Sequence, residues 1–287
     1  MEFSQCPAFR GAGCTDVMDL GLTDARVLVV GGSRGMGRAA AITFAEEGSR
    51  VAVMARSSSA LDDTVALLRS AGSPAALGLS ADLTNPTDVD AAIDRLGQQW
   101  QGLEVLVNAA GPVEVGIGPF EELDDDEWRA TFDIGLMSAV RTVRRALPQL
   151  RRGEFARIVN VSAHSTKRQS PDLVAYTASK AALTSLTKNL SQSLASEGIL
   201  VNTVSPGSFL SEGMKAYLRA LPSERNIDSE SLTDAMRVIR EDFGHPAHLG
   251  RAGDPAEIGP VIAFLASRAN SYMTGADVNV DGGSDFT

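Results

Sequence analysis

The sequence predicts an α/β fold in which one parallel sheet of about seven strands is covered by helices on both faces. Short apolar runs rich in β-branched residues alternate with longer stretches of helical period. The runs are apolar on both faces, as strands are when helices cover both sides of a parallel sheet. A glycine-rich turn directly after the first run is typical of doubly wound, Rossmann-like sheets.

Seven apolar runs are the expected strands, and six stretches of helical period are the expected helices. The strands are residues 26–30, 50–55, 75–79, 103–108, 157–162, 199–205 and 276–281. The helices are residues 36–47, 58–70, 86–100, 125–150, 173–197 and 255–267. Asn85-Pro86 and Asp254-Pro255 put a capping side chain and a proline where two helices begin. The alternation predicts a single domain over residues 24–287.

Two segments fall outside this alternation. Residues 1–23 have no periodic apolar stripe, so we expect a flexible N-terminal arm, or an upstream extension if Met18 is the natural start. Residues 207–250 separate the last two expected strands and contain short helical pieces such as 231–241. Because ligands of parallel sheets bind at the carboxyl ends of the strands, we expect this insertion to be a lid over the site.

Composition excludes several classes of protein. The 36 acidic and 26 basic side chains give a net charge of −10, which disfavours nucleic acid and anionic membranes as partners. No apolar run reaches the roughly 18 residues of a membrane span and no secretory signal is present, so we expect a soluble, cytoplasmic protein. Cys6 and Cys14 lack nearby histidines, so neither a disulfide framework nor a metal site is expected.

Two motifs carry chemistry. The turn from Val30 to Gly37 lets the backbone approach a pyrophosphate, and the helix after it offers free N–H groups. Tyr176 and Lys180 share one helix face, so the ammonium can lower the pKa of the phenol. Taken alone, each motif has an ordinary alternative, a structural turn or a solvated surface pair. Together they indicate a nicotinamide-dependent oxidoreductase.

The spacing of Gly31, Gly35 and Gly37 resembles the Gly-x-x-x-Gly-x-Gly motif of the short-chain dehydrogenase/reductase family, in a 3-oxoacyl-ACP-reductase-like form. Asn108-Ala-Ala-Gly111 is similar to the Asn-Asn-Ala-Gly element of the family, with Ala109 in place of the second Asn. Tyr176 and Lys180 match its Tyr-x-x-x-Lys pair, and Asp281-Gly-Gly283 matches its last strand. The resemblance covers the chain from about residue 26 to residue 283.

The resemblance implies which residues bind the cofactor. The turn holds the pyrophosphate, Asp82 bonds the adenine, and Pro206-Gly207 lies under the nicotinamide. The expected cofactor-binding residues are Gly31, Ser33, Arg34, Gly35, Met36, Gly37, Arg56, Asp82, Leu83, Asn108, Ala109, Ala110, Gly111, Val161, Tyr176, Lys180, Pro206, Gly207, Phe209 and Ser211.

Charge favours NADP(H) over NAD. An NAD enzyme offers an acid to the ribose 2′-OH about 20 residues beyond the glycines, whereas a basic side chain accommodates a 2′-phosphate. Here the second strand ends in Met54-Ala55-Arg56, and Arg34 in the turn supplies a second guanidinium. Arg56 alone would fit a solvated strand end equally well, but the two arginines and the missing acid predict NADPH.

The resemblance implies that Tyr176 protonates a carbonyl oxygen while hydride reaches the carbon, and that Lys180 bonds the nicotinamide ribose. Two positions depart from the family. Ala163 stands thirteen residues before Tyr176, where the family most often has its catalytic Ser, and Gly135 stands where an Asn anchors a relay water. We expect Ser162 or Ser165 to supply the missing hydroxyl, with His164 or lid residues as alternatives.

Two functions remain open. The first is an NADP(H)-dependent oxidoreductase that interconverts a carbonyl and a secondary alcohol on a small, fairly apolar substrate beneath the lid. The second is a catalytically weak or inactive dinucleotide-binding sensor or structural protein. Tyr176 and Lys180 favour the first, whereas Ala163 and Gly135 favour the second. The resemblance also implies a homotetramer or homodimer.

Overall fold

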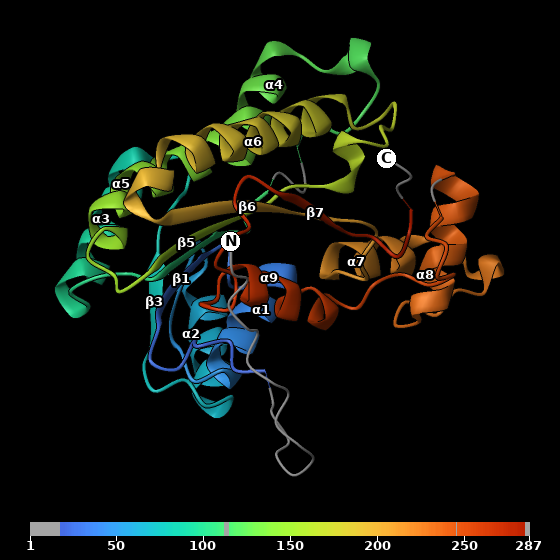
Figure 1. The fold of residues 1–287 in the computed structure, drawn as a ribbon. Helices are drawn as coiled ribbons and strands as arrows, with labels where there is room; N and C mark the ends of the chain where they lie inside the picture. Colours follow the sequence, from blue (N-terminus) through green and yellow to red (C-terminus); the bar gives the residue numbers. More distant parts are fainter. Residues whose placement is uncertain (1–17, 112–114, 245, 285–287) are drawn as a thin grey trace, which may run out of the picture.

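The computed structural model describes residues 18–111, 115–244 and 246–284. Its centre is a seven-stranded sheet in the order β3-β2-β1-β4-β5-β6-β7, with every neighbouring pair parallel (Figure 1). The strands are β1 (Arg26–Val30), β2 (Arg50–Ala55), β3 (Ala76–Ser80), β4 (Val105–Asn108), β5 (Ala156–Val161), β6 (Ile199–Pro206) and β7 (Asp277–Val280). The predicted doubly wound parallel sheet is confirmed.

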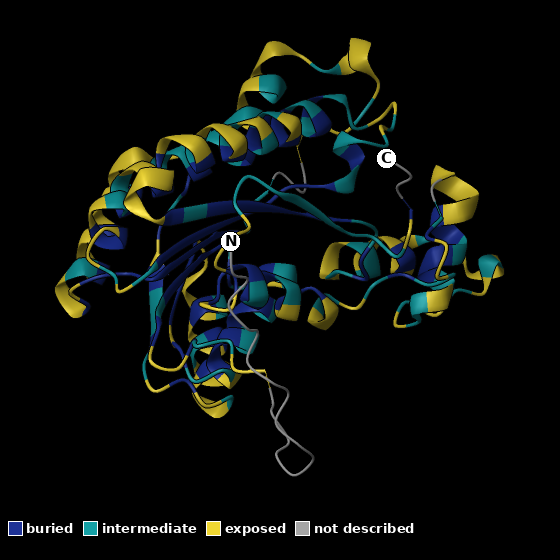
Figure 2. Cartoon of the chain, in the orientation of Figure 1, coloured by how far each residue is buried: buried dark blue, intermediate teal, exposed yellow. Residues whose placement is uncertain are grey.

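Helices cover both faces of the sheet, and each face has its own apolar core. On one face lie α1 (Gly35–Glu46), α2 (Ser58–Ser70) and α9 (Gly259–Leu265). On the other lie α3 (Pro86–Gln99), α5 (Ser138–Leu150) and α6 (Val174–Ser193). Figure 2 shows the central strands buried between the two helical layers. The apolar residues on both faces of the expected strands therefore predicted this architecture correctly.

The start of the described chain corrects one boundary. Leu22 is 1% exposed and belongs to the core beneath α1, and its carbonyl accepts a hydrogen bond of 2.8 Å from the Ser49 hydroxyl. The last residues of the expected arm are therefore packed against the domain. Residues 1–17, with Cys6 and Cys14, lie outside the described residues.

The expected long helix over residues 125–150 is wrong, because it consists of three pieces. The first is α4 (Asp125–Phe132), the second is a π-helical segment (Asp133–Met137), and the third is α5. Gly135 lies in the middle of the π-helical segment, where a glycine weakens the regular helix. The helix after β5 likewise ends in a separate 3-10 turn (Ala195–Glu197), and another 3-10 turn (Pro255–Glu257) precedes α9.

The lid expected over residues 207–250 forms a packed unit. It contains α7 (Glu212–Ala220), α8 (Leu232–Val238) and a second π-helical segment (Ile239–Phe243). Its side chains build a third apolar core, separate from the two on the sheet, from residues that include Leu218, Met236 and Ile239. Ion pairs of Arg225 with Glu241 and Asp242 join the turn before α8 to the second π-helical segment. The insertion extends beyond the carboxyl end of the sheet (Figure 1).

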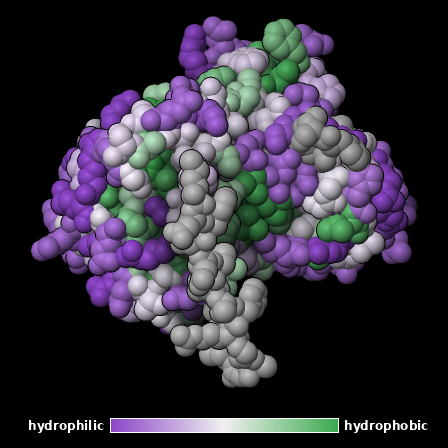
Figure 3. Space-filling model, viewed as in Figure 1, coloured by the Kyte–Doolittle hydropathy of each residue, from purple (hydrophilic) through white to green (hydrophobic). Residues whose placement is uncertain are grey.

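Most of the surface visible in Figure 3 is hydrophilic, with an apolar patch near the centre of the view. All four residues of β7, the edge strand, are only partly buried. Within the described ranges, no helix has the length and apolar character needed to cross a bilayer.

Candidate functional site

The site lies at the carboxyl ends of β1, β4, β5 and β6. The chain leaves β1 toward β2 and β3 on one side and reaches β4, β5 and β6 on the other, so the strand order reverses between β1 and β4. At such a reversal the two connections diverge and leave a crevice, which is where parallel sheets of this kind bind ligands.

The glycine-rich turn is shaped for close approach of a phosphate. Gly31 and Gly35 have φ of 78° and 54°, which favour glycine. A Cβ on Gly31 would lie 2.7 Å from the backbone N of Ala110, and one on Gly37 would lie 2.3 Å from the carbonyl oxygen of Gly31. At the start of α1, Arg34 is extended and its side chain does not cap the helix, so it leaves the first N–H groups of the helix to another acceptor.

The residues expected around the adenosine ribose lie on neighbouring loops. Arg34 and Arg56 are exposed at the turn and just after β2. After β3, the backbone N–H and hydroxyl of Thr84 donate to Asp82 at 2.9 and 2.8 Å, and they hold the pKa of Asp82 below its usual value, with a smaller contribution from Arg56. The buried Leu83 follows it. Arg34 follows β1 and Arg56 follows the neighbouring β2, so both exposed guanidiniums belong to the carboxyl edge of the sheet.

Lys180 links three of the expected segments. Its ammonium donates to the carbonyl oxygens of Val161 and Ala110 at 2.9 and 3.3 Å, and Ala110 lies against Gly31. Lys180 is 3% exposed, and burial lowers its pKa to about 8. One turn earlier on α6, burial raises the pKa of Tyr176 to about 12. We expected Lys180 to lower the pKa of Tyr176. In the protein without cofactor that pKa is raised instead, because desolvation of the phenol dominates.

A buried polar network supports the site from below. Thr142 on α5 donates to Asn108 Oδ1 at 2.7 Å, Asn108 donates to Asn160 at 2.8 Å, and Asn160 donates to Thr187 on α6 at 2.9 Å. It ties two strands to the helices on one face. The Ala109 N–H donates to the Val30 carbonyl at 2.9 Å, which joins this loop to the glycine-rich turn.

The end of β5 shows what surrounds the vacant serine position. Ser162 donates to the carbonyl of Lys180 at 3.0 Å and lies 2.9 Å from the hydroxyl of Thr184, so its side chain faces α6. Ala163 is extended and 6% exposed, and its side chain therefore points away from that of Ser162. Ser165 is buried and accepts a bond of 3.4 Å from Thr177.

The segment after β6 connects the site to the insertion over residues 207–250. His164 Nδ1 lies 3.1 Å from the carbonyl oxygen of Pro206. A Cβ on Gly207 would lie 2.6 Å from Cα of Asp281, so only glycine fits there. Phe209 is 8% exposed and pairs with Gly253, and the Ser211 hydroxyl caps α7 through the N–H of Met214 at 3.3 Å.

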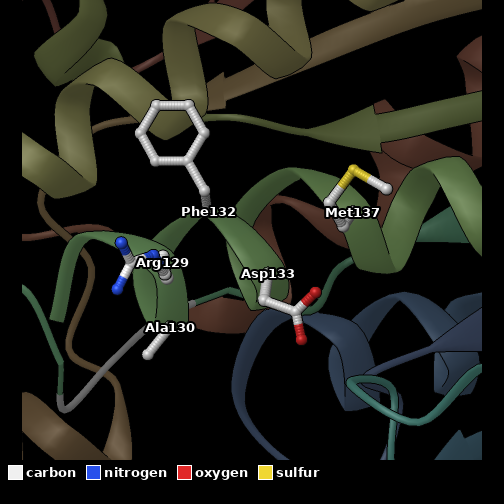
Figure 4. Close-up of a pocket in the computed structure, with 5 residues that line it drawn as sticks. All are labelled: Arg129, Ala130, Phe132, Asp133 and Met137. Carbon is white, nitrogen blue, oxygen red and sulfur yellow. The ribbon is translucent and has the colours of Figure 1, made fainter. Parts of the chain in front are cut away.

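One hollow lies apart from all these residues. It measures about 430 Å³ and is lined by Arg129, Ala130, Phe132, Asp133 and Met137 on α4 and the π-helical segment (Figure 4). Aromatic rings of Phe120, Trp128 and Phe132 pack beside one another on this surface. None of the lining residues belongs to the expected site. Among the described residues, no group of three His, Cys, Asp or Glu side chains is arranged to hold a metal.

Sequence reasoning missed three features here: the π-helical segment around Gly135, the Asn108–Asn160 network, and the contact of His164 with Pro206. The glycine within the helical pattern could have indicated the π-helical segment. The other two join residues more than 40 positions apart and had no local signal.

Known proteins similar to this chain were found by sequence. A family profile described as enoyl-(acyl carrier protein) reductase matches residues 30–285. An uncharacterized oxidoreductase, YvrD, from Bacillus subtilis is 30% identical over 93% of this chain and 98% of its own length. A 3-oxoacyl-[acyl-carrier-protein] reductase, FabG, from Staphylococcus aureus is 31% identical over 89% of this chain and 96% of its own length.

Solved structures agree with the sequence matches. L-sorbose reductase from Gluconobacter frateurii, complexed with NADPH and L-sorbose, superimposes with a TM-score of 0.87 at 26% identity, covering 94% of this chain and all of its own. The RhlG/NADP active-site complex from Pseudomonas aeruginosa has a TM-score of 0.81 at 29% identity, covering 93% of this chain and 98% of its own.

Proposed function

Since this chain belongs to the short-chain dehydrogenase/reductase family, whose members are oxidoreductases acting on CH-OH and C=O groups with NAD(P), we propose that it is an NADPH-dependent carbonyl reductase. The reverse reaction oxidises a secondary alcohol. The observation that carries the proposal is the set of contacts that joins Gly31, Ala110, Val161 and Lys180 at one crevice.

The residues present fit NADPH. A Cβ on Gly31 or Gly37 would clash with neighbouring backbone atoms, so the turn carries no side chain at these two positions. The backbone is therefore open to the approach of a pyrophosphate. Arg34 and Arg56 are exposed and match a 2′-phosphate, and no acid follows β2 to bond a free 2′-OH. The NADPH and NADP complexes among similar structures support the same choice.

When bound, NADPH supplies the hydride. Tyr176 is the proton donor to the carbonyl oxygen, because it carries a phenol on the α6 face one turn from Lys180. Lys180, buried and bonded to two backbone carbonyls, would hold the ribose and offset the charge left on Tyr176. The lid from Gly207 onward covers the substrate and excludes water. We propose a small, fairly apolar substrate.

We also propose a homo-oligomer. The support is the aromatic surface that Phe120, 65% exposed and just before α4, forms with Trp128 and Phe132 on α4, and the hollow beside it, whose rim carries Arg129 and Asp133. The two rim charges are paired within the chain, Arg129 with Asp125 and Asp126 and Asp133 with Arg141. The aromatic rings are therefore the part of this surface that we assign to pairing with a second copy across a two-fold axis.

The test measures NADPH oxidation with acetoacetyl-CoA, ethyl acetoacetate and L-sorbose, together with a fluorescence titration of NADPH. We expect NADPH to bind and at least one ketone to be reduced. Binding without turnover across a wide ketone and alcohol panel would favour the dinucleotide-binding sensor or structural protein instead, an outcome for which Ala163 and Gly135 are the reason.

A further inference from the structure

Residues 162–166, the turn after β5, carry four polar side chains, and all four are bonded to the protein itself. Ser162 donates to the carbonyl of Lys180 at 3.0 Å, and Thr166 donates to that of Ala163 at 2.9 Å. Ser165 accepts from Thr177 at 3.4 Å and is 5% exposed. The hydroxyls nearest to Ala163 are therefore held by α6 or by the turn itself.

The fourth side chain, His164, is fixed in a different way. Its Nδ1 lies 3.1 Å from the carbonyl oxygen of Pro206, the last residue of β6. A carbonyl oxygen can only accept, so Nδ1 carries the hydrogen in both protonation states of the ring. Nε2 is then an acceptor in the neutral imidazole and a donor in the imidazolium.

This contact places the imidazole at the end of β6, on the turn that begins with Ala163. His164 follows Ala163 directly, and Pro206 precedes Gly207, where the lid begins. The ring thus lies between the carboxyl ends of β5 and β6, on the turn that packs against α6, the helix of Tyr176. It is only partly buried, whereas Ser162 and Ser165 are buried.

We propose that His164 is a catalytic residue: as the imidazolium it donates Nε2–H to the carbonyl oxygen of the substrate, the bond that Ala163 cannot make. This inference rests on the proposed function. In reduction, the carbonyl carbon gains the hydride that NADPH supplies, and the oxygen gains the proton of the Tyr176 hydroxyl. The phenolate then regains a proton from solvent. His164 keeps its own protons and stabilises the charge that develops on the oxygen.

The assignment makes the reaction depend on pH through the protonation of the imidazole. Reduction needs the imidazolium, so it weakens as pH rises through the histidine pKa, ordinarily about 6.5. Oxidation passes through the same transition state, in which the alcohol proton goes to the Tyr176 phenolate, so it needs the same imidazolium. Among the described residues, the charged and titratable groups on the surrounding elements include Lys167 and Arg168 on the same loop, Tyr176 and Lys180 on α6, and Asp277 and Asp281 in and after β7. The lid segment 207–211 has none.

Two amide variants separate the catalytic role from the structural one. His164→Asn keeps an N–H at the position of Nδ1 for the Pro206 carbonyl and removes the group at Nε2. His164→Gln supplies an amide N–H near the position of Nε2 at every pH. We expect His164→Asn to lower kcat/KM for reduction about 100- to 1000-fold, the usual loss when one donor to a developing oxyanion is removed.

The matched variant should behave differently. His164→Gln is expected to keep kcat/KM within about tenfold of the parent and to lose the fall between about pH 6 and pH 8. Adding Ala163→Ser to His164→Asn should recover at least about tenfold, because the hydroxyl restores a donor. Nitrogen-15 spectra of the imidazole with NADP⁺ bound should show hydrogen on Nδ1 above the histidine pKa.

Each result decides the proposal. His164→Asn at parental activity would overturn it, and so would equal losses in both amide variants with an unchanged pH profile and no recovery by Ala163→Ser. A neutral ring with hydrogen on Nε2 would overturn it too. If the substrate panel gives no NADPH oxidation, the proposed function fails first. If a ketone is reduced while His164→Asn is unaffected, only the role of His164 fails.

Discussion

Ser162 and Lys180 are joined in two ways across the interface of β5 and α6. The Ser162 hydroxyl donates to the backbone carbonyl of Lys180 at 3.0 Å, and the Lys180 ammonium donates to the carbonyl of Val161, the residue before Ser162, at 2.9 Å. The pair of bonds fixes the helical turn that also carries Tyr176. Ser162, which we expected to replace the missing catalytic hydroxyl, is thus bonded to the helix that carries Tyr176 and Lys180. We propose that it positions Lys180.

Ser162→Ala tests this role. We expect a loss of about 1–3 kcal/mol in the free energy of unfolding, because the buried hydroxyl bond disappears. Urea unfolding measures it. Ser70→Ala is the matched control, since the exposed Ser70 hydroxyl makes a 3.0 Å bond to a carbonyl within α2, and it should change stability by less than about 0.5 kcal/mol. Equal effects in the two variants would contradict the assignment.

Tyr176→Phe should abolish turnover of the reduced ketone and leave the dissociation constant of NADPH nearly unchanged, because only the proton-transfer group is removed. The chain offers a control in Tyr272, which is 97% exposed, so Tyr272→Phe should keep parental kcat. Steady-state kinetics and a fluorescence titration give both quantities. Substantial kcat in Tyr176→Phe would mean that another group is the acid.

Arg56→Asp should reverse the cofactor preference, since a carboxylate repels a 2′-phosphate and accepts from a 2′-OH. The measurement is the ratio of the NADPH and NADH dissociation constants, expected to favour NADPH in the parent. Arg69→Asp on α2 has the same change in charge away from the strand end and should leave the ratio unchanged. Equal dissociation constants in the parent would refute the NADP assignment.

The free energy of unfolding should depend on pH through the titration of Lys180. Its pKa is lowered from 10.5 to about 8, so between these values the unfolded chain holds a proton that the folded chain lacks. Stability from this group therefore rises with pH across that window, by on the order of 3 kcal/mol. Tyr176, raised from 10.0 to about 12, has the opposite sign and lowers stability above pH 10. Urea unfolding of the parent and Lys180→Met at several alkaline pH values should diverge, and parallel curves would contradict the shift.

Phe132→Glu should weaken self-association, because it puts a charge into the apolar hollow on α4. Light scattering after size-exclusion chromatography measures the mass. Leu67→Glu on α2, where Leu67 is 45% exposed, is the control and should leave the mass unchanged. A monomeric parent, or an unchanged mass in Phe132→Glu, would rule out this surface as the interface.

The sequence by itself determined the sheet, the glycine-rich turn and the Tyr176–Lys180 pair. These are local signals: apolar runs of strand length, glycines at positions that need φ of 78° and 54°, and a spacing of one helical turn. Such patterns depend only on neighbouring residues, so they can be recognised without knowing what lies across the sheet.

Only the tertiary structure decided which hydroxyls near Ala163 are held by the protein and where His164 is anchored. Ser162 and Lys180 are 18 positions apart, and His164 and Pro206 are 42 apart, so their contacts depend on the packing of β5, β6 and α6. The pKa of Tyr176 likewise depends on the tertiary structure. Its spacing from Lys180 predicted a lowered value, but burial, which is set by the whole fold, raises it to about 12.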